Sequence, residues 1–205
     1  MPIIATKSTK TYEPIPEGAY PARIYQIIEL GTIAGFQGQL QKKVRITFEF
    51  PTELKVFNEE KGEQPCVLSQ DYTLSFHEKS QLRKVVNACD PKALKEVSED
   101  GFIEEYDIEK LLGKTCLVTV IHKENKTGDQ VYANIANCTV MPKGMTCPPA
   151  INENVSLSFD RFNKDLFETL PEFIKKKIQS SIEYQNMVRD PNEEAFPDIT
   201  LDDIN

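Results

Sequence analysis

The segment 42–50, KKVRITFEF, alternates between polar and apolar residues at every position from Lys43 onward. A period of two places successive side chains on opposite faces of a β-strand. The apolar face of this strand would carry Val44, Ile46, Phe48 and Phe50. The polar face would carry Lys43, Arg45, Thr47 and Glu49. This strand therefore needs a sheet with one side buried in a core and the other side in contact with solvent.

Four further segments have the composition of strands. They are 19–30 (AYPARIYQIIEL), 66–75 (CVLSQDYTLS), 115–122 (TCLVTVIH) and 130–140 (QVYANIANCTV). The last two are joined by Thr127-Gly128-Asp129, which is typical of a hairpin turn. The polar segment 53–65 (ELKVFNEEKGEQP) ends in Pro and predicts a loop.

The period changes between the third and fourth strands. In SFHEKSQLRKVVNAC the apolar residues have the spacing i, i+3, i+4 and i+7, which predicts an amphipathic helix. These residues are Leu82, Val85, Val86 and Cys89. Ser75 and Glu78 have the spacing of a capping box at its start. A short second helix is expected in DIEKLLGK, with Asp107 capping its start and Gly113 at its end.

Three strands, a helical interlude and a two-stranded hairpin follow the order of the OB-fold. This is a partly open five-stranded barrel that binds oligonucleotides on strands 2 and 3 and on the loops 1–2 and 4–5. Single-strand binding combines aromatic side chains with cations that follow the phosphate backbone. Each candidate contact alone is more often an ordinary surface or packing residue, but together they would border one groove. The candidates are Arg23, Tyr25, Lys42, Lys43, Arg45, Tyr72, His122, Lys123, Lys126 and Tyr132.

Several runs of the sequence together resemble a family of bacteriophage-encoded OB-fold proteins regarded as single-stranded-DNA-binding proteins of phage replication. The runs are EGAYPARIYQIIELGT, KVRITFEFPTE, QDYTLSFHEKSQLRKVV, DIEKLLGKTCLVTVIH, GDQVYANI and LPEFIKKKIQSSIEY, within residues 12–187. The resemblance implies non-catalytic binding of single-stranded DNA in phage replication or recombination, in the host cytoplasm and without a cofactor. It also implies phage replication or recombination proteins as partners, and it leaves self-association open.

The charge is distributed unevenly. The net charge is −8, but residues 190–205 hold six of the 32 acids and none of the 24 bases, which leaves 24 bases and 26 acids in the rest of the chain. The tail composition predicts disorder. A tethered polyanion can compete with DNA for a basic groove and can also present apolar residues to a partner. The candidate partner-binding residues are Phe196, Asp198, Ile199, Leu201, Asp202 and Asp203.

The expected organisation has five parts. They are a flexible N-terminus (1–11), the OB-fold domain (12–142), a Pro-rich linker (143–156), a helical extension (157–189) and the disordered acidic tail (190–205). In the extension, Thr169 and Pro171 indicate a helix start, and an apolar stripe follows. The stripe is Phe173, Ile174, Ile178 and Ile182, beside Lys175, Lys176 and Lys177. This helix would pack on the barrel, bind a partner or a second copy, or extend the DNA path.

Other functional classes have weaker signals. No phosphate-binding loop, zincin motif or nucleophile elbow occurs, and Glu53 and Lys55 in TELK have only the E-x-K spacing of metal-dependent nucleases. The five cysteines form no CxxC pair and are expected as free thiols without zinc. No apolar run reaches the roughly 20 residues of a membrane span, so no membrane partner is expected. A protein-interaction or virion-structural OB module is the main alternative to DNA binding.

Overall fold

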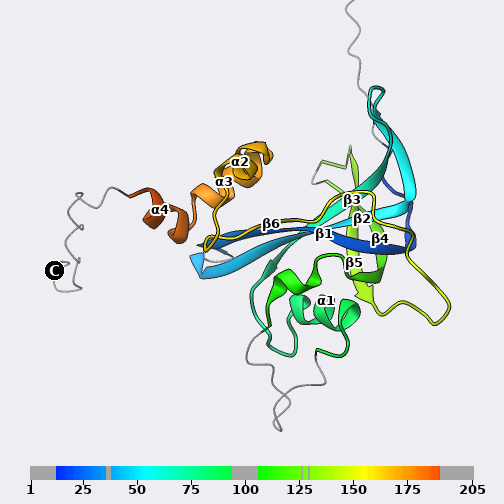
Figure 1. The fold of residues 1–205 in the computed structure, drawn as a ribbon, viewed down its shortest axis with the longest axis horizontal. Helices are drawn as coiled ribbons and strands as arrows, with labels where there is room; N and C mark the ends of the chain where they lie inside the picture. Colours follow the sequence, from blue (N-terminus) through cyan, green and yellow to red (C-terminus); the bar gives the residue numbers. More distant parts are fainter. Residues whose placement is uncertain (1–12, 36–37, 94–105, 126, 129, 190–205) are drawn as a thin grey trace, which may run out of the picture. The chain divides into compact units, whose positions relative to one another are not determined.

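The computed structural model describes residues 13–35, 38–93, 106–125, 127–128 and 130–189 (Figure 1). The strands are β1 (Gly18–Ala34), β2 (Leu40–Asn58), β3 (Gly62–Thr73), β4 (Thr115–Glu124), β5 (Val131–Thr139) and β6 (Val155–Leu157). The helices are α1 (Gln81–Cys89), the 3₁₀ helix η2 (Ile108–Leu111), α2 (Lys164–Thr169), α3 (Glu172–Gln179) and α4 (Ile182–Val188). Residues 1–11 and the acidic tail, with all of its candidate partner residues, lie outside the described part, as does Lys126.

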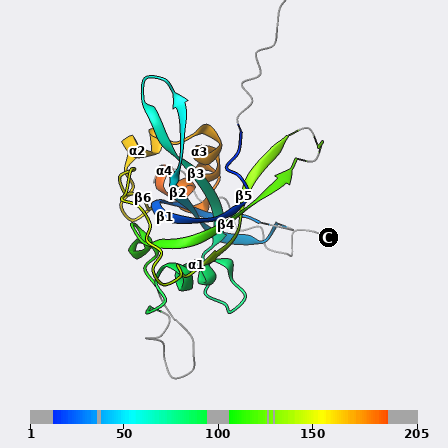
Figure 2. The same ribbon diagram turned by 90° about the vertical axis from the view of Figure 1, so that its right-hand side faces the viewer.

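The main sheet has the strand order β3-β2-β1-β4-β5, and β6 pairs with β1. β1 and β4 are antiparallel, with Gly18 opposite Val120, and β4 and β5 form the predicted hairpin. The five strands curl strongly into an antiparallel half-barrel, and the terminal strands of the order, β3 and β5, contact each other. Figure 2 shows the ends of the β2–β3 and β4–β5 hairpins as two separate projecting arms. The prediction of a mainly β chain is confirmed.

The core of the half-barrel contains the residues that the sequence periodicity predicts. Val44, Ile46, Phe48 and Phe50 of β2 are buried in one cluster. The amphipathic face of α1 belongs to the same cluster through Leu82, Val85, Val86 and Cys89. Ile24 on β1 and Val118 on β4 are also fully buried there. Alternation in the strands and i, i+3, i+4 spacing in the helix therefore point toward a common interior.

The described chain divides into two compact units, each of which contains two separate stretches of sequence. Unit 1 contains residues 13–28 and 44–156, and unit 2 contains residues 29–43 and 157–189. β1 contributes to both, since Ile24 lies in the core of unit 1 whereas Leu30, equally buried, belongs to unit 2. Unit 2 therefore joins residues 29–43 with a stretch of chain that follows about 130 residues later.

Unit 2 is held together at Thr32 and Glu183. The Thr32 backbone N–H donates to Glu183 Oε2 at 2.6 Å, and the Thr32 hydroxyl donates to Oε1 at 2.7 Å. Gly31 has a φ of +77°, and a Cβ at this position would lie 2.6 Å from the Cβ of Ser181. Glycine is thus required both by the backbone conformation and by the close approach of α4. The Phe159 N–H also donates to Glu29 Oε2 at 2.9 Å.

The expected loop at 53–65 is wrong. β2 continues to Asn58 and β3 begins at Gly62, so this segment forms the outer half of a long hairpin. Its turn is stabilised by the Glu60 N–H, which donates to Asn58 Oδ1 at 2.9 Å. Hairpin strands that are exposed on both faces need backbone pairing but no regular apolar face. The polar composition of residues 53–65 therefore did not indicate that they form strands.

One expected helix start is corrected. α1 begins at Gln81 rather than near Ser75, after a turn in which the Ser80 N–H donates to the carbonyl of His77 at 2.8 Å. The short interlude helix is 3₁₀ rather than α-helical, but Asp107 caps its start as predicted, accepting from the Glu109 N–H at 3.0 Å.

The C-terminal helical segment is divided into α2, α3 and α4 instead of forming one helix from Thr169. Thr169 ends α2, and Pro171 occupies the N-cap position of α3. A new start at Ser181, whose hydroxyl accepts from the Tyr184 N–H at 3.2 Å, interrupts the apolar stripe. Ile174 and Ile178 are buried as predicted, whereas Phe173 and Ile182 are exposed.

Candidate nucleic-acid interface

The outer face of β1, β2 and β3 in unit 1 is a set of paired polar side chains. Arg45 Nη1 lies 2.5 Å from Asp71 Oδ1, and the Thr47 hydroxyl lies 3.0 Å from the Ser69 hydroxyl. Thr47 is 2% exposed and Glu49 is fully buried, so the prediction that both face solvent is wrong. The alternation of the strand is correct, but its polar face is also covered.

The cover is the segment 147–152, here called the strap. The fully buried Glu49 carboxylate accepts hydrogen bonds from Arg23 Nη1 at 3.1 Å and from the Ile151 N–H at 3.3 Å. The same carboxylate accepts from both the backbone N–H and Nδ2 of Asn152 at 2.9 Å. Arg23 Nη2 donates to the Pro148 carbonyl at 2.7 Å. Residues 143–156 were expected to be a linker, but the strap within them is fastened to the barrel by a buried ion pair.

Three predicted DNA-binding cations are ion-paired. Arg23 pairs with Glu49 and Arg45 pairs with Asp71, both within unit 1. Lys42 lies in unit 2, where its Nζ is 2.9 Å from Glu29 Oε1. The hydrogen bond that Lys42 donates to Glu29 raises the pKa of Lys42 above its usual value. Lys43, also in unit 2, is half-buried.

Tyr72 lies in the core and is only 4% exposed. Burial, followed by the neighbouring Cys138, Cys116 and Cys89 thiols, raises the pKa of its hydroxyl well above the usual range. Its ring therefore offers no open face to a nucleobase in this conformation. The hydroxyl end borders a cavity of about 380 Å³ between β3 and α1.

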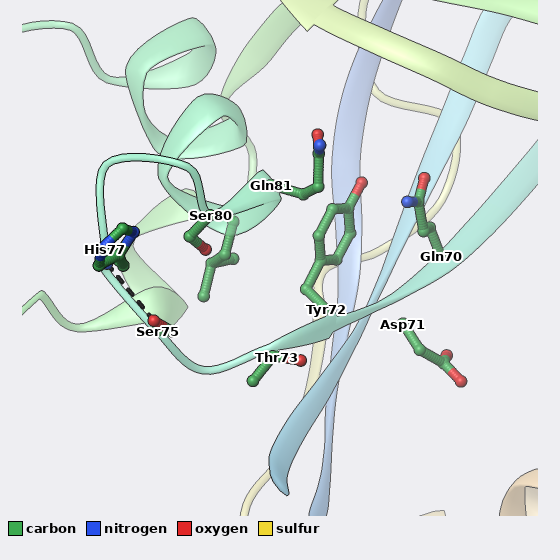
Figure 3. A pocket seen from close by; sticks show the side chains of 9 residues that line it. Gln70, Asp71, Tyr72, Thr73, Ser75, His77, Ser80 and Gln81 are labelled. Atoms are coloured by element: carbon green, nitrogen blue, oxygen red, sulfur yellow. Dashed lines mark hydrogen bonds between the residues drawn. The ribbon is translucent and has the colours of Figure 1, made fainter. Parts of the chain in front are cut away.

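Figure 3 shows this cavity, with Gln70 and Tyr72 on one side of β3 and Asp71 and Thr73 on the other. The remaining lining residues are Ser75, His77, Ser80, Gln81 and Leu82. The lining contains hydroxyls, amides, the Asp71 carboxylate and the His77 ring, but no Lys or Arg. A phosphate would find no counter-charge among these side chains.

The β4–β5 hairpin does bring a predicted cation and a predicted aromatic side chain together. Lys123 lies directly opposite Tyr132 across the two strands, and both are exposed. The Tyr132 hydroxyl donates to Gln130 Oε1. His122, one residue earlier, is held by a 2.7 Å hydrogen bond between Nε2 and the Ile15 carbonyl. Lys123 and Tyr132 thus form one cation-and-aromatic platform on unit 1.

A second platform lies at the base of the β2–β3 arm, around an open cavity of about 280 Å³. We call this the β2–β3 cavity, and it is lined by Tyr25, Phe57, Gln64, Pro65, Val67 and Asn152. Phe57 is 43% exposed. Burial, and then the charge of Glu49, raises the pKa of the Tyr25 hydroxyl above its usual value.

Of these lining residues only Tyr25 was predicted from the sequence as a contact. Phe57 was missed because it lies in the segment expected to be a loop. Asn152 was missed because the strap was expected to be a linker, and no sequence signal indicates that residues about 100 positions from Glu49 return to it. The alternation of polar and apolar residues in ELKV, residues 53–56, was an available signal for the arm.

The cysteines are free, and Cys66, Cys89, Cys116 and Cys138 are buried. The hydrogen bond with Cys138 acts to lower the pKa of the Cys116 thiol, but the hydrogen bond with Cys89 and burial outweigh it, so this pKa is raised. Thiols of this kind are protonated and poorly nucleophilic. Among the described residues, no group of three or more His, Cys, Asp or Glu side chains is arranged to hold a metal.

The E-x-K pair of the nuclease alternative lies on the β2–β3 arm. Lys55 Nζ donates to the Glu13 carbonyl at 2.7 Å and to the Pro14 carbonyl at 3.3 Å, which ties the N-terminal segment to the arm.

A scan against protein-family models finds no match, and no curated protein matches the sequence. In the portion of the chain that the structure describes, no helix has the length and apolar character needed to cross a membrane.

Proposed function

We propose that the protein is a non-catalytic single-stranded-DNA-binding protein of phage replication or recombination, built on an OB-fold. The observation that carries the proposal is the topology of unit 1. Its strand order is β3-β2-β1-β4-β5, its end strands contact each other, and α1 follows β3 in the chain. The same strand order and helix position are expected of an OB-fold barrel, which commonly binds oligonucleotides, and this agreement supports the proposal.

The DNA would contact the two exposed arms rather than the charged face of β2. The Tyr25 and Phe57 side chains at the β2–β3 cavity and the Lys123–Tyr132 pair on the β4–β5 hairpin supply aromatic surfaces and a cation. Stacking on aromatic side chains tolerates any base, because every base has a π-face. Lys42, Arg23 and Arg45 are neutralised by carboxylates and would contribute little to phosphate binding.

The test is a fluorescence-anisotropy titration of the full chain with a labelled oligothymidylate at several salt concentrations. Because few cations are unpaired on the arms, we expect a shallow log–log salt dependence, with a slope of about −1 to −3 for two to four phosphate contacts. Absence of binding at low salt, both by the full chain and by a chain ending at Arg189, would reject the proposal.

The acidic tail is proposed to compete with DNA and to recruit a replication or recombination partner through Phe196, Ile199 and Leu201. Removing residues 190–205 takes away six carboxylates and no base. Affinity for the oligonucleotide at low salt should therefore rise on truncation at Arg189. Unchanged or weaker affinity would count against competition by the tail.

One observation favours the alternative of a protein-interaction or virion-structural module. The β2–β3 arm exposes four apolar side chains, Leu54, Val56, Phe57 and Val67. Phe57 and Val67 line one open cavity, and exposed apolar patches are typical of surfaces that bind another protein. The titration separates the two functions, and a light-scattering mass measurement of the free protein reports self-association through the arm.

A further inference from the structure

The β2–β3 cavity contains an amide whose orientation is fixed by the buried ion pair. Asn152 Nδ2 donates to Glu49 Oε2 at 2.9 Å. An ionised carboxylate only accepts hydrogen bonds, so the nitrogen of this amide must face Glu49. The remaining polar atom, Asn152 Oδ1, is an acceptor, and Asn152 lines the cavity.

The other lining residues suit a flat, partly polar ring. Tyr25 and Phe57 provide aromatic surfaces, and Pro65 and Val67 provide apolar ones. The volume of about 280 Å³ accommodates a single base.

We infer that the β2–β3 cavity binds one unpaired nucleobase and that Asn152 makes it prefer bases with an exocyclic amino group. This inference rests on the proposed binding of single-stranded DNA. The 4-amino group of cytosine can donate a hydrogen bond to the Asn152 Oδ1 acceptor. Uracil and thymine carry an oxygen at position 4, so the same acceptor would face a second acceptor. Glu49 acts as a positioning residue, because its carboxylate prevents the amide from turning to present a donor instead.

Oligodeoxycytidylate and oligodeoxyuridylate of equal length test the preference. Cytosine carries an amino group at position 4 and an unprotonated N3, whereas uracil carries a carbonyl at position 4 and a hydrogen on N3. We expect the full chain to bind the cytidylate at least about five-fold more tightly, the effect of one unsatisfied hydrogen-bonding group. The variant Asn152→Ala should bind both oligonucleotides with affinities equal within about two-fold. The matched control is Asn154→Ala, which alters an exposed amide close to the strap that does not line the cavity and should keep the preference.

The outcomes are distinct. A full chain that binds both oligonucleotides equally, or an Asn152→Ala variant that keeps the preference, overturns the inference and leaves single-strand binding intact. A full chain that binds neither oligonucleotide, nor oligothymidylate, rejects the proposed function and the inference together. Thermal denaturation of Asn152→Ala establishes that a lost preference does not come from unfolding, since the Asn152 backbone N–H still reaches Glu49.

Discussion

The two halves of β2 differ although they belong to one continuous strand. In its middle, residues 44–51, nearly every side chain is buried. The charged side chains there form ion pairs, Arg45 with Asp71 and Glu49 with Arg23. Its outer part, residues 52–58, is exposed and presents Phe57 to an open cavity. The charged residues in the alternating pattern of a strand therefore do not indicate which charges a ligand can reach. Ligand contacts are expected where the fold leaves side chains uncovered.

The strongest test of the buried half is Glu49→Ala. This change leaves the Arg23 guanidinium and the strap amides without their common acceptor, and breaking a buried pair in this way costs about 3–5 kcal/mol. We expect a loss of this size in the free energy of unfolding measured in urea.

Glu59→Ala, on the exposed turn of the same hairpin, is the control and should change this free energy by no more than about 0.5 kcal/mol. A Glu49→Ala protein within about 1 kcal/mol of the parent would mean that the strap does not depend on this carboxylate.

The exposed half is tested by Phe57→Ala. Loss of one stacking side chain should weaken oligothymidylate binding by about 1–3 kcal/mol, measured by anisotropy. Stability should change little because the side chain is 43% exposed. Leu54→Ala is a matched control, since Leu54 is 42% exposed on the same strand but does not line the cavity. Equal losses in the two variants would show that the cavity is not the contact.

The smallest expected effect is the pH dependence of stability that Glu183 gives to unit 2. It contrasts with the large effect expected for the buried Arg23–Glu49 ion pair of unit 1. Burial acts to raise the pKa of Glu183, but the Thr32 backbone N–H and hydroxyl lower it more, and the net pKa lies below the ordinary value of 4.5. A depressed pKa gives stability that is present above about pH 4.5 and is lost as the pH falls through the folded value. Glu183 is half-buried and still partly screened by solvent, which limits the effect to about 1 kcal/mol.

Urea denaturation of the parent and of Glu183→Gln should therefore differ more at pH 6 than below pH 4. Glu153→Gln, an exposed change in unit 1, serves as the control. A difference between parent and Glu183→Gln that stays constant over this range would contradict the assignment.

Sequence periodicity predicts the strands and the helix that have one face buried in the core. Val44 to Phe50 and the face of α1 are placed correctly because burial on one side leaves a regular apolar pattern. The same pattern cannot report that Glu49 is covered from the other side, since its cover comes from Ile151 and Asn152, about 100 residues away.

The candidate site was predicted less completely than the fold. Tyr25, Lys123 and Tyr132 lie on the two platforms. The cations Arg23, Lys42 and Arg45 were predicted from their charge and their place around the expected groove, and the pairing that neutralises them depends on partners that the sequence does not identify.

The return of the chain to residues 29–43 also has a consequence for synthesis. Thr32 leaves the ribosome long before Glu183, the residue 151 positions later to which it is bound in the folded protein. At about 5–20 residues per second, this interval is roughly 8–30 s. During that time Leu30, fully buried in the finished protein, lacks the segment from Leu157 onward, which is the rest of its compact unit. Nascent or prematurely terminated chains are therefore the form in which this protein is most exposed to aggregation and to chaperones.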